Sequence, residues 1–276
     1  MAAEAQVSCS HSNRAMKCLG DSMTDIVLEQ SGRVLTVTID RAPVNALTLA
    51  LYERIAELFN EISRRDDVHC VILTGRGNKA FCAGLDLQEF MAAQLADDPA
   101  RAAIVRETFR AVRQCAIPVI AAVNGPALGA GNVLAAVADI RIASERATFG
   151  TPEINVGRCG GGAHLGRLVP PGMLRLMYFT GEPISAWEAH RVGLVDQLVS
   201  ARRLMPAARE LAETIAAKSP LGLRMAKEAL NRTEWMPVEE GYALEQQYST
   251  RLMATEDARE AARAAVEKRP PVFKGR

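Results

Sequence analysis

The fold is decided by one stretch, Pro118-Val119-Ile120-Ala121-Ala122-Val123-Asn124-Gly125-Pro126-Ala127-Leu128-Gly129-Ala130-Gly131. Residues 119–123 are all apolar, as expected of a strand whose two faces are both covered. The glycine-rich turn after them leads into the apolar residues 133–137, which predict a buried helix. A strand that passes through a tight turn into a helix is a building unit of α/β folds.

The same order of elements appears on both sides of this stretch. β-Branched residues predict a strand over 34–39, and apolar runs predict strands over 68–73 and 140–143. Between them, residues 91–115 are mainly helical, and a helix that opens at 45–48 carries an apolar face at helical spacing. That face consists of Leu51, Ile55, Leu58, Phe59 and Ile62. We therefore expect an α/β core with mostly parallel strands over the first ~180 residues.

Strand signals become rare from Ser185 onward, and helical patterns replace them. They lie at 185–191, 204–217, 221–231, 239–252 and 255–267. We predict a disordered tail over residues 1–22, an α/β core over 23–200 and a helical extension over 201–276 that docks on the core. The tail is polar and weakly patterned, which fits neither a secretory signal nor an arginine-rich transit peptide.

The composition excludes several classes of protein. The 276 residues are 49% hydrophobic and 24% charged, which is ordinary for a globular chain with a substantial core. Lys and Arg number 33 against 32 Asp and Glu, so no global field draws the chain to nucleic acid or to an anionic membrane. No apolar run reaches transmembrane length. The 6 cysteines include no CxxC pair, and we expect a reduced, cytoplasmic protein.

Two glycine-containing turns follow predicted strands and precede predicted helices, at 79–87 and 124–132. Such turns direct backbone N–H groups into a cleft, where two converging groups can hold an oxyanion. Nucleotide motifs are absent from the sequence: there is no GxxxxGK[ST], and Gly157 to Gly162 lacks the strand and acidic residue of a dinucleotide site. No GxSxG elbow occurs, and the 4 histidines are scattered, so a metal site is not expected.

Five motifs, in order and with their spacing intact, resemble the crotonase (enoyl-CoA hydratase/isomerase) superfamily. They are residues 81–87, 120–131, 147–154 with the glycine cluster after it, 185–195 and the ending 267–276. The resemblance implies a crotonase-like spiral of ββα units with a helical C-terminal extension that forms trimers, and hence a homo-trimer or hexamer. It also implies an acyl-CoA thioester substrate, with coenzyme A as part of the substrate and no permanently bound cofactor. A membrane or nucleic-acid partner is not expected.

The resemblance also assigns roles to individual residues. The N–H groups of Leu85 and Ala130 would hold the thioester oxygen, although the family usually has glycine at the position of Ala130. Glu153 matches one of the two glutamates that hydratases use as acid and base, and a partly buried position would raise its pKa. The residues that would bind substrate lie in both turns, on the helix after the second turn and in the glycine cluster: Ala83, Gly84, Asp86, Leu87, Gly129, Val133, Gly160 and Gly161. Asp86 is also predicted as a helix N-cap. Coenzyme A would be held by Lys79, Ala80 and Phe81 and by Lys268, Phe273 and Lys274, the last three from the same chain or from a neighbouring subunit.

The second glutamate of the hydratases would fall at Val133, and a valine cannot transfer a proton. Three reactions stay open: double-bond isomerisation by one glutamate, hydration or hydratase-lyase chemistry in which Glu153 serves both steps with a tyrosine assisting, and decarboxylation of a malonyl-type thioester. A non-catalytic CoA-ester-binding or RNA-binding homologue is the alternative of another class. The helix after Asn45 mixes Glu with Arg, which does not favour RNA.

Overall fold

A twisted sheet runs through the core of the computed structural model, which describes residues 25–276; the predicted tail over 1–22 lies outside them. Its strand order is β1-β2-β3-β4-β6-β9. β1 is antiparallel to β2, and every other neighbouring pair is parallel. The strands are β1 (Ile26–Ser31), β2 (Val34–Ile39), β3 (Cys70–Gly75), β4 (Val119–Val123), β6 (Ile140–Ser144) and β9 (Gln197–Val199). The prediction of a mostly parallel α/β core is confirmed.

A smaller sheet and a series of helices complete the fold. The smaller sheet has the order β5-β7-β8 and stands beside the first. Its strands are β5 (Ala127–Leu128), β7 (Thr148–Gly150) and β8 (Ile184–Ser185). The helices of the core are α1 (Leu49–Ile62), α2 (Leu87–Ala92), α3 (Asp98–Gln114), α4 (Ala130–Ala136), α5 (Gly162–Leu165), α6 (Pro171–Thr180), α7 (Ala186–Arg191) and α8 (Leu204–Ala216), with short 3₁₀ turns η1 (Leu95–Asp97), η2 (Pro152–Val156) and η3 (Ala201–Arg203).

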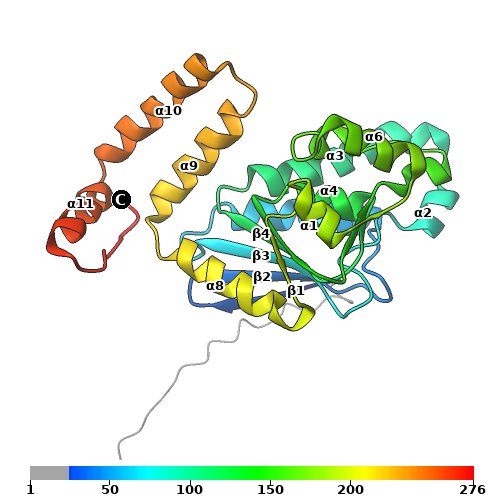
Figure 1. Cartoon of the computed structure of the whole chain (residues 1–276), viewed down its shortest axis with the longest axis horizontal. Helices are drawn as coiled ribbons and strands as arrows, with labels where there is room; N and C mark the ends of the chain where they lie inside the picture. The colour runs from blue at the N-terminus through cyan, green and yellow to red at the C-terminus, as the bar shows by residue number, and fades with distance from the viewer. Residues whose placement is uncertain (1–24) are drawn as a thin grey trace, which may run out of the picture.

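The apolar strands are explained by helices on both faces of the large sheet. Val71 and Leu73 of β3 pack in one cluster with α1, α3 and α4, whereas Cys70 and Ile72 pack against α8 on the opposite face. Figure 1 shows these two layers, with α8 on one side of the strands and α1 and α4 on the other. Because successive strand residues point to opposite faces, a strand covered twice needs apolar residues at every position.

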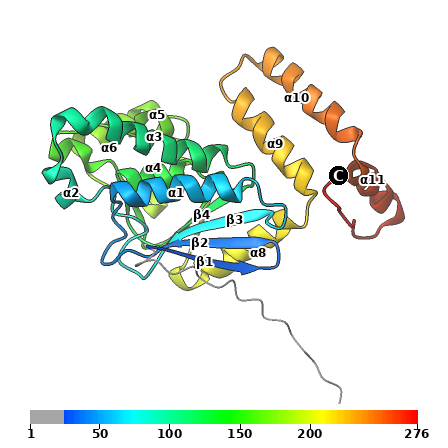
Figure 2. The same cartoon turned by 180° about the vertical axis from the view of Figure 1, so that it is seen from behind.

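The last three helices form an arm that leaves the core. They are α9 (Pro220–Thr233), α10 (Val238–Met253) and α11 (Glu256–Glu267), and Figures 1 and 2 show α10 and α11 projecting away from the sheet. The root of the arm is tied down by Lys227, whose ammonium group lies 2.7 Å from the Asp139 carboxylate and 3.1 Å from the Ile117 carbonyl. The predicted extension begins with α8, which packs on the sheet, and α9 is bonded to the core through Arg224 and Asn231, so that α10 and α11 are the helices that project.

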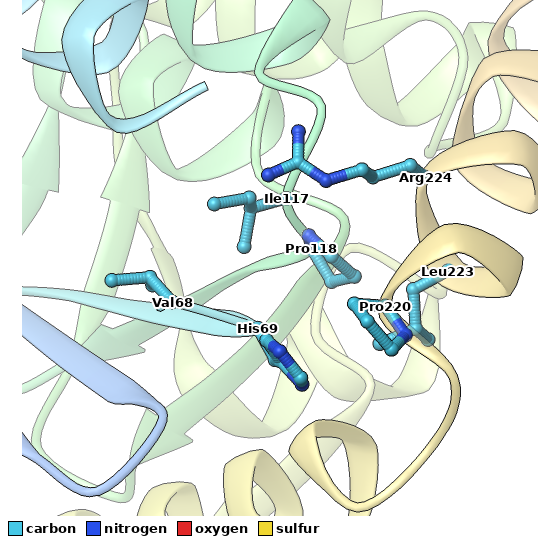
Figure 3. A pocket seen from close by; sticks show the side chains of 7 residues that line it. All are labelled: Val68, His69, Ile117, Pro118, Pro220, Leu223 and Arg224. Carbon is cyan, nitrogen blue, oxygen red and sulfur yellow. The ribbon is translucent and has the colours of Figure 1, made fainter. Parts of the chain in front are cut away.

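A buried histidine lies where the arm begins. Figure 3 shows His69, directly before β3, close to Pro220 of α9; both residues line a small pocket together with Arg224. Its Nδ1 is 3.1 Å from the Ala216 carbonyl oxygen, and its Nε2 is 2.7 Å from the Arg33 guanidinium. A carbonyl only accepts and a guanidinium only donates, so the proton is on Nδ1 and the ring is neutral. Burial also lowers the pKa of His69.

Candidate active site

The two glycine-containing turns meet beyond the carboxyl ends of β3 and β4, the usual place for ligands in parallel sheets. The Leu128 N–H donates to the Cys82 carbonyl at 3.0 Å, which joins the turns directly. Gly131 lies so close to the other turn that a Cβ atom there would be 2.1 Å from the Cys82 oxygen. The glycines are therefore required by the close approach of two backbones.

The predicted oxyanion-hole residues lie together in this contact. Leu85 lies opposite Leu47 in a parallel β-bridge. The two hydrogen bonds of this bridge join Leu47 to the Gly84 carbonyl and to the Asp86 N–H, so the bridge does not use the Leu85 N–H. Ala130 is the first residue of α4, and its nitrogen lies 3.6 Å from the place a Cβ on Gly84 would take. Within residues 25–276, neither N–H donates to a protein acceptor. An oxyanion hole requires two such free N–H groups near each other, so the prediction for Leu85 and Ala130 stays open.

Gly129 fixes the direction of the second N–H group. Its backbone angles, φ 53° and ψ −120°, are those of a type II′ turn, which side-chain-bearing residues avoid. Its N–H donates to the Gly150 carbonyl at 2.9 Å, and its own carbonyl accepts from the Val133 N–H at 3.0 Å. A Cβ at this position would also come within 3.0 Å of the Glu153 Oε1 atom. Gly129 thus allows the carboxylate to approach the turn.

Glu153 belongs to η2, directly after the small sheet. Its Oε1 lies against Gly129, while its Oε2 is buried and has no hydrogen-bond partner among the described residues. Burial raises the pKa of this carboxyl above its ordinary value. A buried oxygen without a partner is costly for the folded protein, and carboxyl groups with perturbed pKa values cluster at functional sites.

Val133 lies on α4 and is almost fully buried. A Cβ on Gly161 would come within 2.3 Å of its Cγ2 atom, so Gly161 packs directly on this valine. The hydroxyl group of Tyr178, on α6, donates to the Gly160 carbonyl and lies 3.8 Å from the same Cβ position on Gly161. The valine, the glycine cluster and this phenol therefore form one wall.

Two tyrosines near Glu153 were not singled out from the sequence. Burial raises the pKa of Tyr52, and burial raises the pKa of Tyr178 to about 12; the negative charge of Glu153 adds to both shifts. Tyr52 lies on the apolar face of α1, where it resembles any core residue. Tyr178 lies in a helix that the sequence analysis did not predict, so no local signal marked either phenol.

The remaining residues of the first turn have different environments. Asp86 is the N-cap of α2, since its carboxylate accepts from the Gln88 and Glu89 N–H groups at 3.0 Å, as predicted. Leu87 is exposed and Ala83 is half-buried. Ala80 and Phe81 are buried in the core, so of the predicted coenzyme A residues at 79–81 only the Lys79 side chain is free to reach a ligand.

The three predicted coenzyme A residues at the C-terminus are not brought to this site within one chain. Phe273 and Lys274 line a cavity of about 550 Å³ with Arg33 and Asp67, at the amino ends of β2 and β3. The oxyanion turns lie at the opposite, carboxyl ends of the same strands. Lys268, Phe273 and Lys274 could therefore meet Lys79 only across a subunit boundary, which stays a prediction.

Residues 25–276 hold neither a cluster of metal ligands nor a helix suited to span a membrane. No group of three or more His, Cys, Asp or Glu side chains in this part of the chain has the arrangement of a metal site. None of the helices described there combines the length and apolarity that crossing a membrane requires.

Known proteins resemble the chain over almost its entire length. The Enoyl-CoA hydratase/isomerase family model matches residues 29–276. A short-chain-enoyl-CoA hydratase from Clostridium acetobutylicum is 37% identical over 251 residues, which cover 90% of this chain and 96% of that protein. A carnitinyl-CoA dehydratase from Salmonella agona is 37% identical over 259 residues, covering 90% and 98%. The crystal structure of an enoyl-CoA hydratase from Bacillus anthracis superposes with a TM-score of 0.88 at 36% identity, covering 92% of this chain and all of that one.

Proposed function

The chain belongs to the enoyl-CoA hydratase/isomerase family and is an acyl-CoA enzyme of that type, and we propose that Glu153 is its single catalytic carboxylate. The family and the crotonase-like fold expected from the sequence are both confirmed. The proposal is carried by one observation: half-buried Glu153 lies against the oxyanion turn with a buried Oε2 atom that has no partner within residues 25–276, and valine occupies position 133.

The arrangement supports proton transfer through a thioester enolate. With a 3-enoyl thioester, Glu153 removes a proton from Cα, and the electrons move onto the thioester oxygen. The N–H groups of Leu85 and Ala130 stabilise that negative charge without having to reorganise. The protonated Glu153 then returns the proton to Cγ, which yields the 2-enoyl thioester. One carboxylate completes this cycle, so isomerisation does not need a group at position 133.

Hydration is the second candidate, because the names of the relatives and the Tyr178 hydroxyl group on the wall beside Val133 both favour it. The two relatives above are named a hydratase and a dehydratase, reactions that move water across the same kind of bond in opposite directions. In the single-carboxylate form, Glu153 takes a proton from water while the water oxygen bonds to Cβ. The same proton is then delivered to Cα. Decarboxylation would use the oxyanion hole alone.

An enzyme is better supported than a binding protein. The arginine of α1 that could contact RNA, Arg54, lies 3.4 Å from Glu57 and 3.6 Å from Glu61, so its charge is compensated. A protein that only binds coenzyme A esters gains nothing from the cost of the buried, unpartnered Oε2 atom of Glu153. We further propose a homo-trimer or hexamer, since the arm exposes Trp235, Val238 and Met253.

The proposal is tested with two thioesters in separate progress curves, 3-hexenoyl-CoA for isomerisation and crotonyl-CoA for hydration. We expect the initial rate of isomerisation to exceed that of hydration by roughly the 10²-fold or more that a positioned acid–base group contributes. Malonyl-CoA in a third curve reports decarboxylation. Hydration as fast as isomerisation would contradict isomerisation as the main reaction and favour the second candidate, and no turnover of any of the three would favour a binding protein.

A further inference from the structure

We propose that Tyr178 is a positioning residue that orients the reacting water, or the β-hydroxyl group in the reverse reaction, on the Val133 side of the site. This inference rests on the proposed function of Glu153. The Tyr178 hydroxyl group provides a polar atom, which Val133 lacks, on the wall of the site where two-carboxylate hydratases have their second glutamate. The water-dependent reaction therefore depends on Tyr178, whereas proton transfer between carbon atoms does not.

The position of the phenol is fixed by three neighbouring glycines. The Tyr178 hydroxyl donates to the Gly160 carbonyl. A Cβ atom on Gly162 would lie 3.0 Å from the hydroxyl oxygen, and one on Gly161 would lie 3.8 Å from it. The Cβ position of Gly161 is in turn 2.3 Å from Val133 Cγ2. The absence of side chains at 161 and 162 thus lets the hydroxyl group come close to the valine.

The hydroxyl group can bind water but cannot replace a carboxylate as a base. Its proton is directed at the Gly160 carbonyl. The backbone N–H of Gly162 also approaches the phenol oxygen, which keeps a second lone pair that can accept a hydrogen bond from water. Because burial and the Glu153 charge raise the pKa of Tyr178 to about 12, the phenol stays neutral at any working pH. A water that donates one O–H to the phenol and the other to the Glu153 carboxylate is held between the two groups.

This arrangement assigns each atom in hydration. The water oxygen forms its bond to Cβ as the Cα–Cβ double bond shifts its electrons to the thioester oxygen. Glu153 takes the proton that water had directed toward it and then passes it to Cα. The O–H that pointed at Tyr178 remains as the hydroxyl group of the 3-hydroxyacyl product. Tyr178 neither gains nor loses a proton, and so its contribution is orientation alone.

The test is Tyr178→Phe, which removes one oxygen and keeps the ring. Tyr242→Phe is the matched control, because Tyr242 is exposed on α10, far along the arm. Wild type and both variants are assayed for crotonyl-CoA hydration and 3-hexenoyl-CoA isomerisation, and their thermal midpoints are recorded. We expect Tyr178→Phe to lower kcat for hydration about tenfold or more, the scale of one lost hydrogen bond to the reacting group, with isomerisation within about twofold of wild type.

The ratio of the two rates separates positioning from a structural role. If Tyr178 only supported the glycine cluster, its loss would lower both reactions by the same factor, and that result would overturn the inference. An unchanged hydration rate in Tyr178→Phe would overturn it as well. Failure of the proposed function gives a different result. Wild type would then show no isomerisation that depends on Glu153, and the role of Tyr178 would be refuted together with the proposed function.

Discussion

Replacing Glu153 with glutamine should abolish turnover and at the same time stabilise the folded protein. Glutamine has nearly the same shape but cannot accept the substrate proton, and the loss of a positioned acid–base group costs about 10²–10⁴-fold in rate. Binding of an unreactive acyl-CoA should change little, because the free N–H groups of Leu85 and Ala130 are retained.

The gain in stability follows from the buried oxygen without a partner. An unsatisfied buried polar group costs about 1–3 kcal/mol, and more when it is charged, so we expect the neutral amide to recover about 1 kcal/mol at pH 7. In a domain of this size that corresponds to a rise of about 2–4 °C in thermal midpoint. Since burial raises the pKa of Glu153, the ionised form disfavours folding. The carboxyl group of Glu153 therefore contributes most to the stability of the folded protein at low pH, and this contribution is lost as pH rises through the raised pKa. The gain in thermal midpoint from Glu153→Gln should accordingly grow from pH 5 to pH 8.

The assay is differential scanning fluorimetry at both pH values, beside initial rates with 3-hexenoyl-CoA. Glu145→Gln serves as a control, because it makes the same chemical change at an exposed glutamate close in sequence. Its midpoint and rate should match those of wild type. The reasoning is refuted if Glu153→Gln turns over substrate, or if its midpoint at pH 8 does not exceed that of wild type.

Three further outcomes are expected. Val133→Glu should raise crotonyl-CoA hydration relative to isomerisation, by up to the ~10²-fold of an added acid–base group, and lower the thermal midpoint because it buries a carboxyl group; an unchanged rate ratio would count against the pocket described above. Asp86→Ala should lower the free energy of unfolding, measured in urea, by about 1 kcal/mol, because α2 loses its N-cap. Asp86→Asn should lower it less, and equal losses in the two variants would show that the cap is unimportant. Burial lowers the pKa of His69, so the neutral ring stabilises the fold above its ordinary pKa of 6.5, and this contribution is lost as pH falls. The thermal midpoints measured at pH 7.5 and pH 5.5 should therefore differ more in wild type than in His69→Gln.

The elements that the sequence predicted are those whose pattern is set by burial. Residues 119–123 and 34–39 read as strands because helices cover both faces, and the role of Glu153 was predicted from the motif around it. β1 was not predicted, since it is an edge strand with mostly exposed side chains and so lacks an alternating pattern. β5 and β8 have only two residues each, too few to show a pattern.

The parts of the site that stayed unpredicted depend on contacts between distant segments. Tyr178 owes its position to the glycines of another loop, and nothing in the residues beside it indicates that contact. The projection of the arm was likewise not predicted: α8 and α9 have similar amphipathic patterns, yet α8 packs on the sheet and α9 leaves it. Periodicity reports that a helix has an apolar face, but not which surface covers that face.

The contact between Gly161 and Val133 restricts how this pocket can evolve. Gly161 has φ 80°, a conformation that other residues adopt with strain, and any side chain there would collide with the valine. Substitutions that change this part of the pocket are therefore confined to position 133 on α4. Smaller residues at position 133 would deepen the pocket and admit bulkier acyl groups, while polar ones would add chemistry. Selection for a new substrate in this lineage, natural or in the laboratory, should accumulate changes at position 133 while position 161 stays glycine.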